Sequence, residues 1–309
     1  MRPIHHLVSV SGGKDSTATL LLARMQFPHN FSAVFADTGN EHEATYEYIS
    51  YLGAALGIEV KRLKVDFSDR FPSKRKWIAE KWPEHGVPAA QVARALELLH
   101  PTGNPYLDLC MLKGRFPSRM AQFCTEELKT KPLTEYALDI VDIADVDVWS
   151  WQGVRRDESE RRKNALGHEE IGAGIWAHRP IAGWTAQQTV DFVVKICGVR
   201  LNPLYEQGMG RVGCMPCINA NKEELAEIAR RFPEHIKRIA EWEALVIAVS
   251  KRLGASFFPA PTGDNRGVLR GGDIWSQVKW ARTFRGGKVQ DPRWEEDAPA
   301  CASSYGLCE

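Results

Sequence analysis

Six consecutive residues near the start of the chain have the types needed to hold a phosphate group: Ser11, Gly12, Gly13, Lys14, Asp15 and Ser16. Glycines let the backbone approach an anion closely, hydroxyls add donors, and a lysine supplies a point charge for phosphate. The spacing is tighter than in the usual P-loop, which has four residues between its glycines. Asp15 is unexpected in a pure anion trap, but its carboxylate suits a Mg²⁺ ion that bridges nucleotide phosphates.

Cysteines form the second group of residues with evident chemistry. The chain has seven, and an odd number argues against a disulfide framework and for thiol, metal or redox chemistry. Cys214 and Cys217 form a C-x-x-C turn that presents two thiolates to one metal, although a redox dithiol or half of a zinc site has the same pattern. Cys124 lies at a predicted helix start, where the helix dipole would lower its pKa. Cys110 and Cys197 are expected to pack as apolar side chains.

The segments around the first loop predict a parallel α/β sheet. A β-rich run at 5–11 precedes the loop and an apolar stretch follows it, so the loop joins a strand to a helix. Further elements are predicted in the order strand, helix, strand, at 31–37, 43–56 and 58–65. This alternation indicates right-handed βαβ units in a parallel twisted sheet with helices on both faces. In such a loop the backbone N–H groups and the positive helix end converge on one point.

The rest of the chain predicts a further strand and several helices. A polar segment at 101–118, which contains several Gly and Pro residues, separates two predicted helical regions. The expected elements are an interrupted helical stretch at 72–100, a helix around 125–138, a strand at 147–154, a helix at 185–197 capped by Thr185, and two helices at 221–253 broken near Pro233. We predict a nucleotide-binding domain over 1–220 and a helical extension with an Arg/Trp-rich, irregular tail over 221–309.

Several ordered motifs together resemble a known family. They are "SGGKDS", "FADTGNEHEAT" (35–45), "WQGVRRDESERR" (151–162), "RPIAGWT" (179–185) and "NPLYEQGMGRVGCMPC" (202–217). This series resembles the phosphoadenosine phosphosulfate (PAPS) reductase family of the PP-loop ATP pyrophosphatase superfamily. The resemblance implies a Rossmann-like fold of the adenine nucleotide alpha hydrolase type. It implies that the nucleotide is bound by Ser11, Gly12, Gly13, Lys14, Asp15, Ser16, Asp37, Thr38, Gly39, Arg155 and Arg156.

The resemblance also implies a metal centre. In the iron–sulfur branch of the family, cysteines at the equivalents of "CTEELK" and "GCMPC" bind a 4Fe–4S cluster, which implies Cys124, Cys214 and Cys217 here. Those members often carry a Cys-Cys pair at the first place, whereas Phe123 precedes the cysteine in this chain. Cys301 and Cys308 in the tail are then candidates for the fourth ligand. Zinc is the alternative metal, since four thiolates suit it equally well.

Two enzymatic functions fit the resemblance. The first is ATP cleavage to AMP and pyrophosphate by Lys14, Asp15 and Arg155, which activates an acceptor for sulfur transfer, as in DNA phosphorothioation and tRNA thiolation enzymes. A cysteine desulfurase would be a partner, and DNA or tRNA a possible acceptor. The second is reduction of adenylyl sulfate or PAPS to sulfite, with Cys308 as nucleophile and thioredoxin as partner. A nucleotide-binding module without activity is disfavoured, because it would not need both a lysine and an aspartate in the loop.

Composition excludes other classes. The formal net charge is +1 and 26% of the residues are charged, so no global field favours nucleic acid or a membrane surface. No run of about 18 apolar residues is present, and we expect a cytoplasmic protein without a membrane partner. Basic residues and tryptophans alternate between Arg266 and Trp294. That pattern suits a nucleic-acid strand, but we favour a surface flap with buried tryptophans and solvated arginines.

Overall fold

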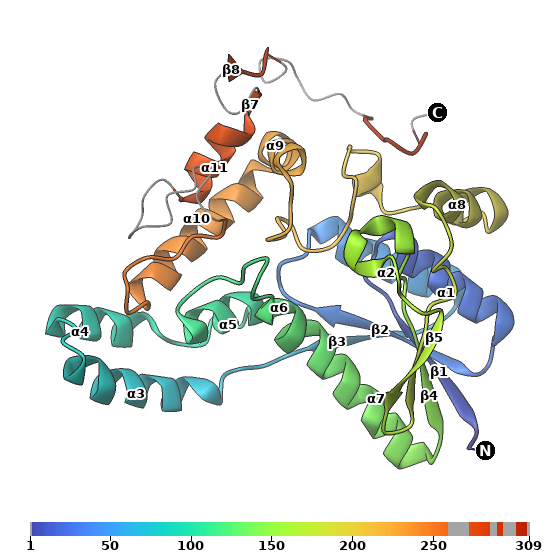
Figure 1. Ribbon diagram of the computed structural model, residues 1–309, viewed down its shortest axis with the longest axis horizontal. Helices are drawn as coiled ribbons and strands as arrows, with labels where there is room; N and C mark the ends of the chain where they lie inside the picture. The colour runs from blue at the N-terminus through green and yellow to red at the C-terminus, as the bar shows by residue number, and fades with distance from the viewer. Residues whose placement is uncertain (1, 259–271, 285–288, 293–300, 308–309) are drawn as a thin grey trace.

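The structure is a computed structural model that describes residues 2–258, 272–284, 289–292 and 301–307. Its centre is a six-stranded sheet with the strand order β3-β2-β1-β4-β6-β5 (Figure 1). The strands are β1 (Ile4–Ser9), β2 (Phe31–Asp37), β3 (Val60–Lys64), β4 (Asp147–Trp151), β5 (His168–Gly172) and β6 (Ile175–His178). All neighbouring pairs are parallel except β5 with β6. A separate pair is formed by β7 (Thr283–Phe284) and β8 (Val289–Gln290).

Helices cover both faces of the sheet, as the sequence predicts. In β1, Val8 belongs to the cluster that includes α1, α2 and α8, whereas its neighbour Leu7 packs with α7 on the other face. These helices are α1 (Lys14–Gln26), α2 (Glu43–Leu56), α7 (Lys131–Ala144) and α8 (Ala186–Asp191). The alternation of side chains along a strand therefore gives the sheet two buried faces, and the doubly wound α/β prediction is confirmed.

A second group of helices packs beside the sheet, at the left of Figure 1. It comprises α3 (Arg70–Glu84), α4 (Ala89–Leu98), α5 (Pro105–Lys113), α9 (Lys222–Arg231), α10 (Pro233–Ala248) and α11 (Ile274–Ala281). Their apolar side chains form one buried cluster around Trp82, Phe71 and Phe257. Helices from both sides of residue 220 share this cluster, and the boundary after residue 220 stays a prediction.

Irregular helical turns connect the two groups. The short helix α6 (Phe123–Thr125) continues as a π-helical turn, η1 (Glu126–Thr130), which leads into α7. A second π-helical turn, η4 (Phe192–Ile196), extends α8. The 3₁₀ turns are η2 (Arg156–Glu158), η3 (Glu160–Arg162) and η5 (Pro203–Tyr205). Such π turns frequently occur at functional sites, because they redirect side chains within a helix.

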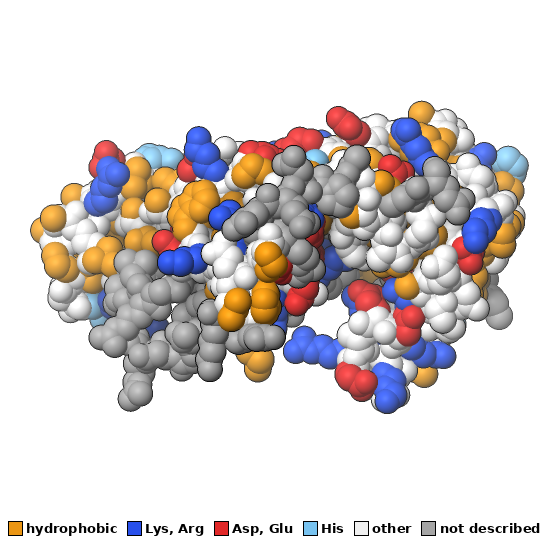
Figure 2. All heavy atoms as spheres, turned by 90° about the horizontal axis from the view of Figure 1, so that it is seen from above, with side chains coloured by type: hydrophobic (Ala, Val, Ile, Leu, Met, Phe, Trp, Pro, Cys, Tyr) orange, Lys and Arg blue, Asp and Glu red, His pale blue; other side chains and the backbone are white. Residues whose placement is uncertain are grey.

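Acidic and basic side chains are interspersed on the face shown in Figure 2. In the part of the chain that the structure describes, no helix is long and apolar enough to cross a membrane.

Candidate functional site

Hydrogen bonds to serine hydroxyls within the loop between β1 and α1 hold the loop in its conformation. The Ser11 N–H donates to Ser16 Oγ at 3.0 Å, and that hydroxyl donates to the Gly13 carbonyl at 2.9 Å. Gly12 has a φ of +77°, and a Cβ there would lie 2.8 Å from Thr45 Cγ2. A glycine is therefore required at position 12 both by the left-handed backbone and by the contact with α2.

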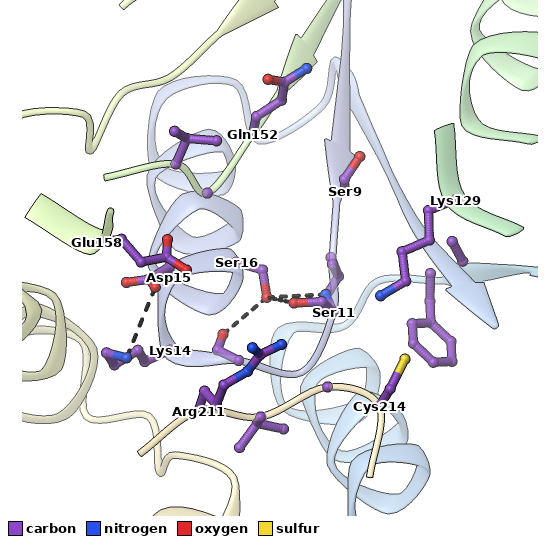
Figure 3. A pocket seen from close by; sticks show the side chains of 18 of the residues that line it. Ser9, Ser11, Lys14, Asp15, Ser16, Lys129, Gln152, Glu158, Arg211 and Cys214 are labelled. Atoms are coloured by element: carbon purple, nitrogen blue, oxygen red, sulfur yellow. Dashed lines mark hydrogen bonds and ion pairs between the residues drawn. The ribbon is translucent and has the colours of Figure 1, made fainter. Parts of the chain in front are cut away.

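A carboxylate lies between two cations at the start of α1. Asp15 Oδ1 accepts a hydrogen bond from Arg155 Nε at 2.6 Å, and Asp15 Oδ2 lies 4.0 Å from Lys14 Nζ (Figure 3). Arg155 also pairs with Asp157. Burial opposes the charge on Arg155, but Asp15 and Asp157 outweigh it and raise the pKa of the guanidinium. The sequence predicts a site containing Lys14, Asp15 and Arg155, and the structure brings these three side chains together.

Two tyrosines surround the lysine. The Lys14 N–H donates to Tyr205 Oη at 2.9 Å, and Lys14 Nζ lies 5.4 Å and 5.0 Å from the ring centroids of Tyr205 and Tyr305. Tyr305 Oη donates in turn to the Gly210 carbonyl at 2.9 Å. These contacts hold the described tail residues 301–307 against the phosphate loop, which the sequence did not predict.

A cavity of about 890 Å³ opens beside this loop. It lies at the carboxyl ends of β1 and β4, where the strand order reverses from β1-β2 to β1-β4. Ligands of open α/β sheets bind at this type of position. Gly153 follows β4, and a Cβ there would lie 2.8 Å from the Asp15 carbonyl carbon and the Ser16 nitrogen. The backbone after β4 is thus in close contact with the phosphate loop.

The opposite wall of the cavity carries thiols and a lysine. Cys214, Cys217 and Lys129 line it, and Figure 3 shows Lys129 and Cys214 on one side of Ser11 and Ser16, with Lys14 and Asp15 on the other. Burial raises the pKa of Cys214 to about 12. The pKa of Lys129 is raised, and the main cause is the negative charge that Cys214 carries in its ionised form. The wall therefore places a cation beside the Cys214 thiol, and this cation would stabilise the ionised form of that thiol.

Cys214 is held by the segment that follows β2. Its Sγ lies 3.4 Å from Thr38 Oγ1 and donates to Glu41 Oε1 at 3.7 Å. The Met215 N–H donates to the Asn40 carbonyl at 2.7 Å, so the C-x-x-C turn and this segment are linked through the backbone.

The prediction that a helix dipole lowers the pKa of Cys124 is wrong. Cys124 does lie in the first turn of a helical stretch that continues from α6 through η1 into α7, but the thiol is largely buried. Burial and the neighbouring Cys217 thiol instead raise the pKa of Cys124.

The predicted nucleotide-binding residues after β2 lie next to the cavity without lining its described walls. The carboxylate of Asp37 is buried and accepts hydrogen bonds from Tyr46 Oη at 2.8 Å and Arg62 Nε at 2.8 Å. Thr38 Oγ1 donates to a Glu41 oxygen at 2.7 Å. A Cβ at Gly39, with φ of +76°, would lie 2.8 Å from Pro105 Cδ. These three residues order the turn after β2, and their contact with a nucleotide stays a prediction.

The remaining predicted site residues are placed as follows. Arg156 is exposed and its Nε donates to the Ala165 carbonyl at 2.9 Å. Cys301 is disulfide-bonded, so its thiolate would be available to a metal only after reduction. Cys308 lies outside the described residues, and its roles as nucleophile and ligand stay predictions. Part of the Arg/Trp-rich segment, including Arg266, also lies outside them.

Several residues that line the cavity were not singled out from the sequence: Lys129, Glu158, Tyr205, Arg211 and Tyr305. Each falls within or beside a motif whose other residues were noticed, such as "CTEELK" for Lys129 and "GRVGCMPC" for Arg211. Charged or aromatic residues inside a motif are the signal that could have identified them.

The chain is similar to proteins of one family. Residues 5–220 match the phosphoadenosine phosphosulfate reductase domain. A relative in Escherichia phage 186, named "Uncharacterized 37.8 kDa protein in gpa 5'region", is 46% identical over 98% of this chain and 96% of its own length. The adenosine 5'-phosphosulfate reductase of Streptomyces coelicolor is 39% identical over 32% of this chain and 39% of its own length. The phosphate complex of PAPS reductase from Candida auris aligns over 70% of this chain and 83% of that chain, with 16% identity and a TM-score of 0.42.

Proposed function

The chain belongs to the phosphoadenosine phosphosulfate reductase domain family, and from this membership we propose that it cleaves ATP to AMP and pyrophosphate and activates an acceptor for sulfur transfer. One observation carries the proposal. The phosphate loop with Lys14 and Asp15 lines the same cavity as the thiols of Cys214 and Cys217. A nucleotide whose phosphates lie on the loop would place its reacting phosphorus in a cavity that also contains sulfur ligands.

The chemistry of the first step follows from the loop. An acceptor oxygen attacks the α-phosphorus of ATP, the bond to the β-phosphate oxygen breaks, and pyrophosphate leaves. Lys14 stabilises the charge that develops on the leaving group. Asp15 binds the Mg²⁺ ion that accompanies ATP, and Arg155 orients its carboxylate through the 2.6 Å hydrogen bond.

The second step is displacement of AMP from the adenylated acceptor by a sulfur nucleophile. Cys124, Cys214 and Cys217 would hold an iron–sulfur cluster, which when bound would supply sulfur or electrons at this wall of the cavity. The thiol donors and the nearby cation Lys129 fit an anionic metal group of this kind. A cysteine desulfurase is the class of partner that provides persulfide sulfur. DNA, tRNA and small molecules all remain candidate acceptors.

Reduction of adenylyl sulfate is the second candidate, and one structural observation favours it. The described tail reaches the cavity through Tyr305, and Cys308 follows three residues later in the sequence. In this alternative a tail thiolate attacks the sulfur of adenylyl sulfate, the S–O bond to AMP breaks, and a protein thiosulfonate forms. A thioredoxin thiol then releases sulfite. The local similarity to an adenosine 5'-phosphosulfate reductase supports this alternative.

A comparison of two substrates tests the proposal. Anaerobically purified protein is incubated with ATP and Mg²⁺, with DNA, tRNA or buffer alone, and AMP and pyrophosphate are quantified. A parallel reaction contains adenylyl sulfate and a thiol, and sulfite is measured. We expect equal amounts of AMP and pyrophosphate from ATP. Sulfite from the second reaction, with no AMP from the first under any condition, would establish the reductase alternative instead.

A further inference from the structure

Cys110 lies in α5, the helix that precedes the short helix α6 of Cys124. The residue is 1% exposed, and a buried cysteine usually acts as a small apolar side chain. Helix α5 starts at a well-defined cap, because Asn104 Oδ1 accepts from the Leu107 N–H at 3.0 Å. The same Asn104 side chain donates to the Gly39 carbonyl at 2.7 Å. The start of α5 is therefore attached to the segment that also holds the C-x-x-C turn.

A tyrosine one turn before Cys110 has an unused hydroxyl. Tyr106 is 2% exposed, its ring stacks on Trp242 with 5.6 Å between centroids, and its Oη has no hydrogen-bond partner among the described residues. An unsatisfied buried hydroxyl destabilises the folded protein. A bound group with acceptor atoms beside Tyr106 would remove this destabilisation.

The free thiols that surround this hydroxyl include Cys110 as well as the predicted ligands. Cys124 and Cys217 pack against the same buried cluster that contains Cys110 and Tyr106. Cysteines from three separate segments thus pack in or against one buried cluster with this phenol, and Cys214 lies in the same C-x-x-C turn as Cys217.

Three cations lie around these thiols, together with the carboxylates of Glu41 and Glu224. Lys129 lies beside Cys214, and Arg238 donates to the Met215 carbonyl at 2.8 Å within the C-x-x-C turn. Arg211 lies 3.8 Å from Glu224 and beside Cys217. A cluster with four thiolate ligands is anionic, and these cations would neutralise it.

The arrangement is wider than a zinc site. From a Zn–S bond of about 2.3 Å, the sulfurs of a tetrahedral zinc site lie about 4 Å apart. Among the described residues, three possible metal donors have all their ligand atoms within 4.8 Å of one another: His42, Glu43 and His235. No three thiols of the described part of the chain form such a group. A metal group larger than a single ion would suit the more widely spaced sulfurs.

The tail is less suited to complete this set. Cys301 is disulfide-bonded, and its neighbour Ala302 donates to the Glu206 carbonyl at 2.7 Å. Ala302 also lies near Gly208, where a Cβ would be 3.3 Å from the alanine Cβ. The described tail is therefore packed on the segment after η5.

We propose that Cys110 is the fourth ligand of an iron–sulfur cluster held with Cys124, Cys214 and Cys217. The proposal rests on the cluster included in the proposed function, and it replaces the expectation that Cys110 only packs and that the tail supplies the fourth ligand. Tyr106 then lies beside the cluster as a hydrogen-bond donor.

Iron retention in cysteine variants tests this ligand set. Wild-type protein, Cys110→Ala, the double variant Cys301→Ala/Cys308→Ala and the control Cys197→Ala are reconstituted anaerobically with ferrous iron and sulfide. Iron, acid-labile sulfide and visible absorption are measured, followed by the rate of iron loss to a chelator. We expect Cys110→Ala to lose iron at least about tenfold faster than wild type. The double variant and Cys197→Ala should match wild type.

Two further measurements separate ligation from folding. Cys110→Ala should keep the far-UV circular dichroism and the ATP-induced thermal shift of wild type. Cys110→Ser, whose oxygen can ligate iron, should retain a cluster with an altered electron paramagnetic resonance spectrum. If Cys110→Ala does not fold, an unchanged wild-type spectrum in Cys110→Ser would overturn the proposal. Wild-type iron retention in a folded Cys110→Ala, or iron loss in the tail variant, would also overturn it.

Two results would distinguish a failure of this ligand assignment from a failure of the proposed function. Wild-type protein that makes AMP but binds neither iron nor sulfide would overturn this ligand assignment and leave ATP cleavage standing. A cluster lost in Cys110→Ala, in a protein that makes no AMP, would support the ligand assignment and contradict the proposed function.

Discussion

At the scale of single residues, Asp15 distinguishes this loop from a simple phosphate cradle. Its two oxygens face different cations, with Arg155 Nε at 2.6 Å and Lys14 Nζ at 4.0 Å. A carboxylate fixed on one side by an arginine has its other oxygen beside Lys14, in the wall of the cavity. This arrangement suits a metal-bound triphosphate better than a free anion, which a carboxylate would repel.

Replacement of Lys14 tests the role of its charge. In Lys14→Ala we expect AMP formation to fall about 10²–10³-fold, because a preorganised charge at the leaving group is lost. Iron content should not change, since the lysine lies away from the cysteine wall. The matched control is Lys195→Ala, which changes an exposed lysine that pairs with Asp191 on the surface of the protein. Equal AMP formation in wild type and Lys14→Ala would contradict the assigned role.

Replacement of Tyr106 tests its unused hydroxyl. In Tyr106→Phe we expect the metal-free protein to be more stable to urea by about 1 kcal/mol, because an unsatisfied buried group is removed. The cluster-loaded variant should have a lower reduction potential, since a hydrogen-bond donor beside the cluster is lost. Tyr136→Phe, at a partly buried tyrosine under Lys61, is the control. A less stable metal-free Tyr106→Phe would show that the hydroxyl already has a partner.

At the scale of elements, the segment after β4 fixes the position of the phosphate loop. Gly153 follows that strand with no room for a Cβ, because the backbone of Asp15 and Ser16 lies within 3 Å of the position it would occupy. Backbone cannot move as easily as the end of a side chain. The geometry of the loop therefore depends on an element more than 130 residues away in the sequence.

The pair Gly153→Ala and Gly183→Ala tests this contact. At Gly183 a Cβ would meet nothing within 4 Å. We expect Gly153→Ala to weaken ATP binding by at least about tenfold, as overpacking of 1–3 kcal/mol displaces the loop. Gly183→Ala should bind ATP like wild type. Titration calorimetry with ATP and Mg²⁺ measures both, and equal affinities would show that the loop does not depend on this contact.

Much of this framework could be predicted from local sequence. The strand at 31–37 and the helix at 43–56 have their predicted bounds, and Thr185 forms a capping box at α8. Pro233 is the first residue of α10, as the predicted break requires. The β5–β6 hairpin was not predicted, because charged residues such as Glu170 obscure the alternation of this edge strand.

Other features depend on contacts that a local pattern cannot show. Helix α5 lies in the segment that was noted only for its polar, Gly- and Pro-rich character, although Asn104, Pro105 and Gly114 mark its ends. The packing of Cys124 and Cys217 against the buried cluster of Cys110 depends on the fold of three separate segments. The approach of Tyr305 to the phosphate loop spans most of the chain. The sequence therefore identified the motifs, but the residues that complete the site required the structure.

At the scale of the whole molecule, one buried carboxyl connects parts of the helical group. Glu243 in α10 is 4% exposed and accepts hydrogen bonds from the Phe257 N–H at 2.8 Å and the Ile274 N–H at 2.9 Å. Glu243 thus connects the backbone at Phe257 to the start of α11. Burial raises the pKa of Glu243 from 4.5 to about 7.

This pKa predicts a pH dependence of stability. Between pH 4.5 and about 7 the folded protein keeps a proton on Glu243 that the unfolded chain has released. The free energy of unfolding should therefore fall as pH rises through this window, by about 3 kcal/mol in total from this group. Urea unfolding at several pH values measures the slope, and Glu243→Gln should reduce it. An identical pH profile in wild type and Glu243→Gln would contradict the prediction.

The central claim is that this loop directs cleavage between the α- and β-phosphates of ATP. The most direct measurement is the fate of ATP labelled at the α-phosphorus, incubated with Mg²⁺, the cluster-loaded protein and candidate acceptors. We predict that the label appears in AMP, or in an adenylated acceptor that later yields AMP, and that Lys14→Ala lowers its release about 10²–10³-fold. Label found only in ADP or in unreacted ATP with every acceptor, together with sulfite formation from adenylyl sulfate, would contradict the account.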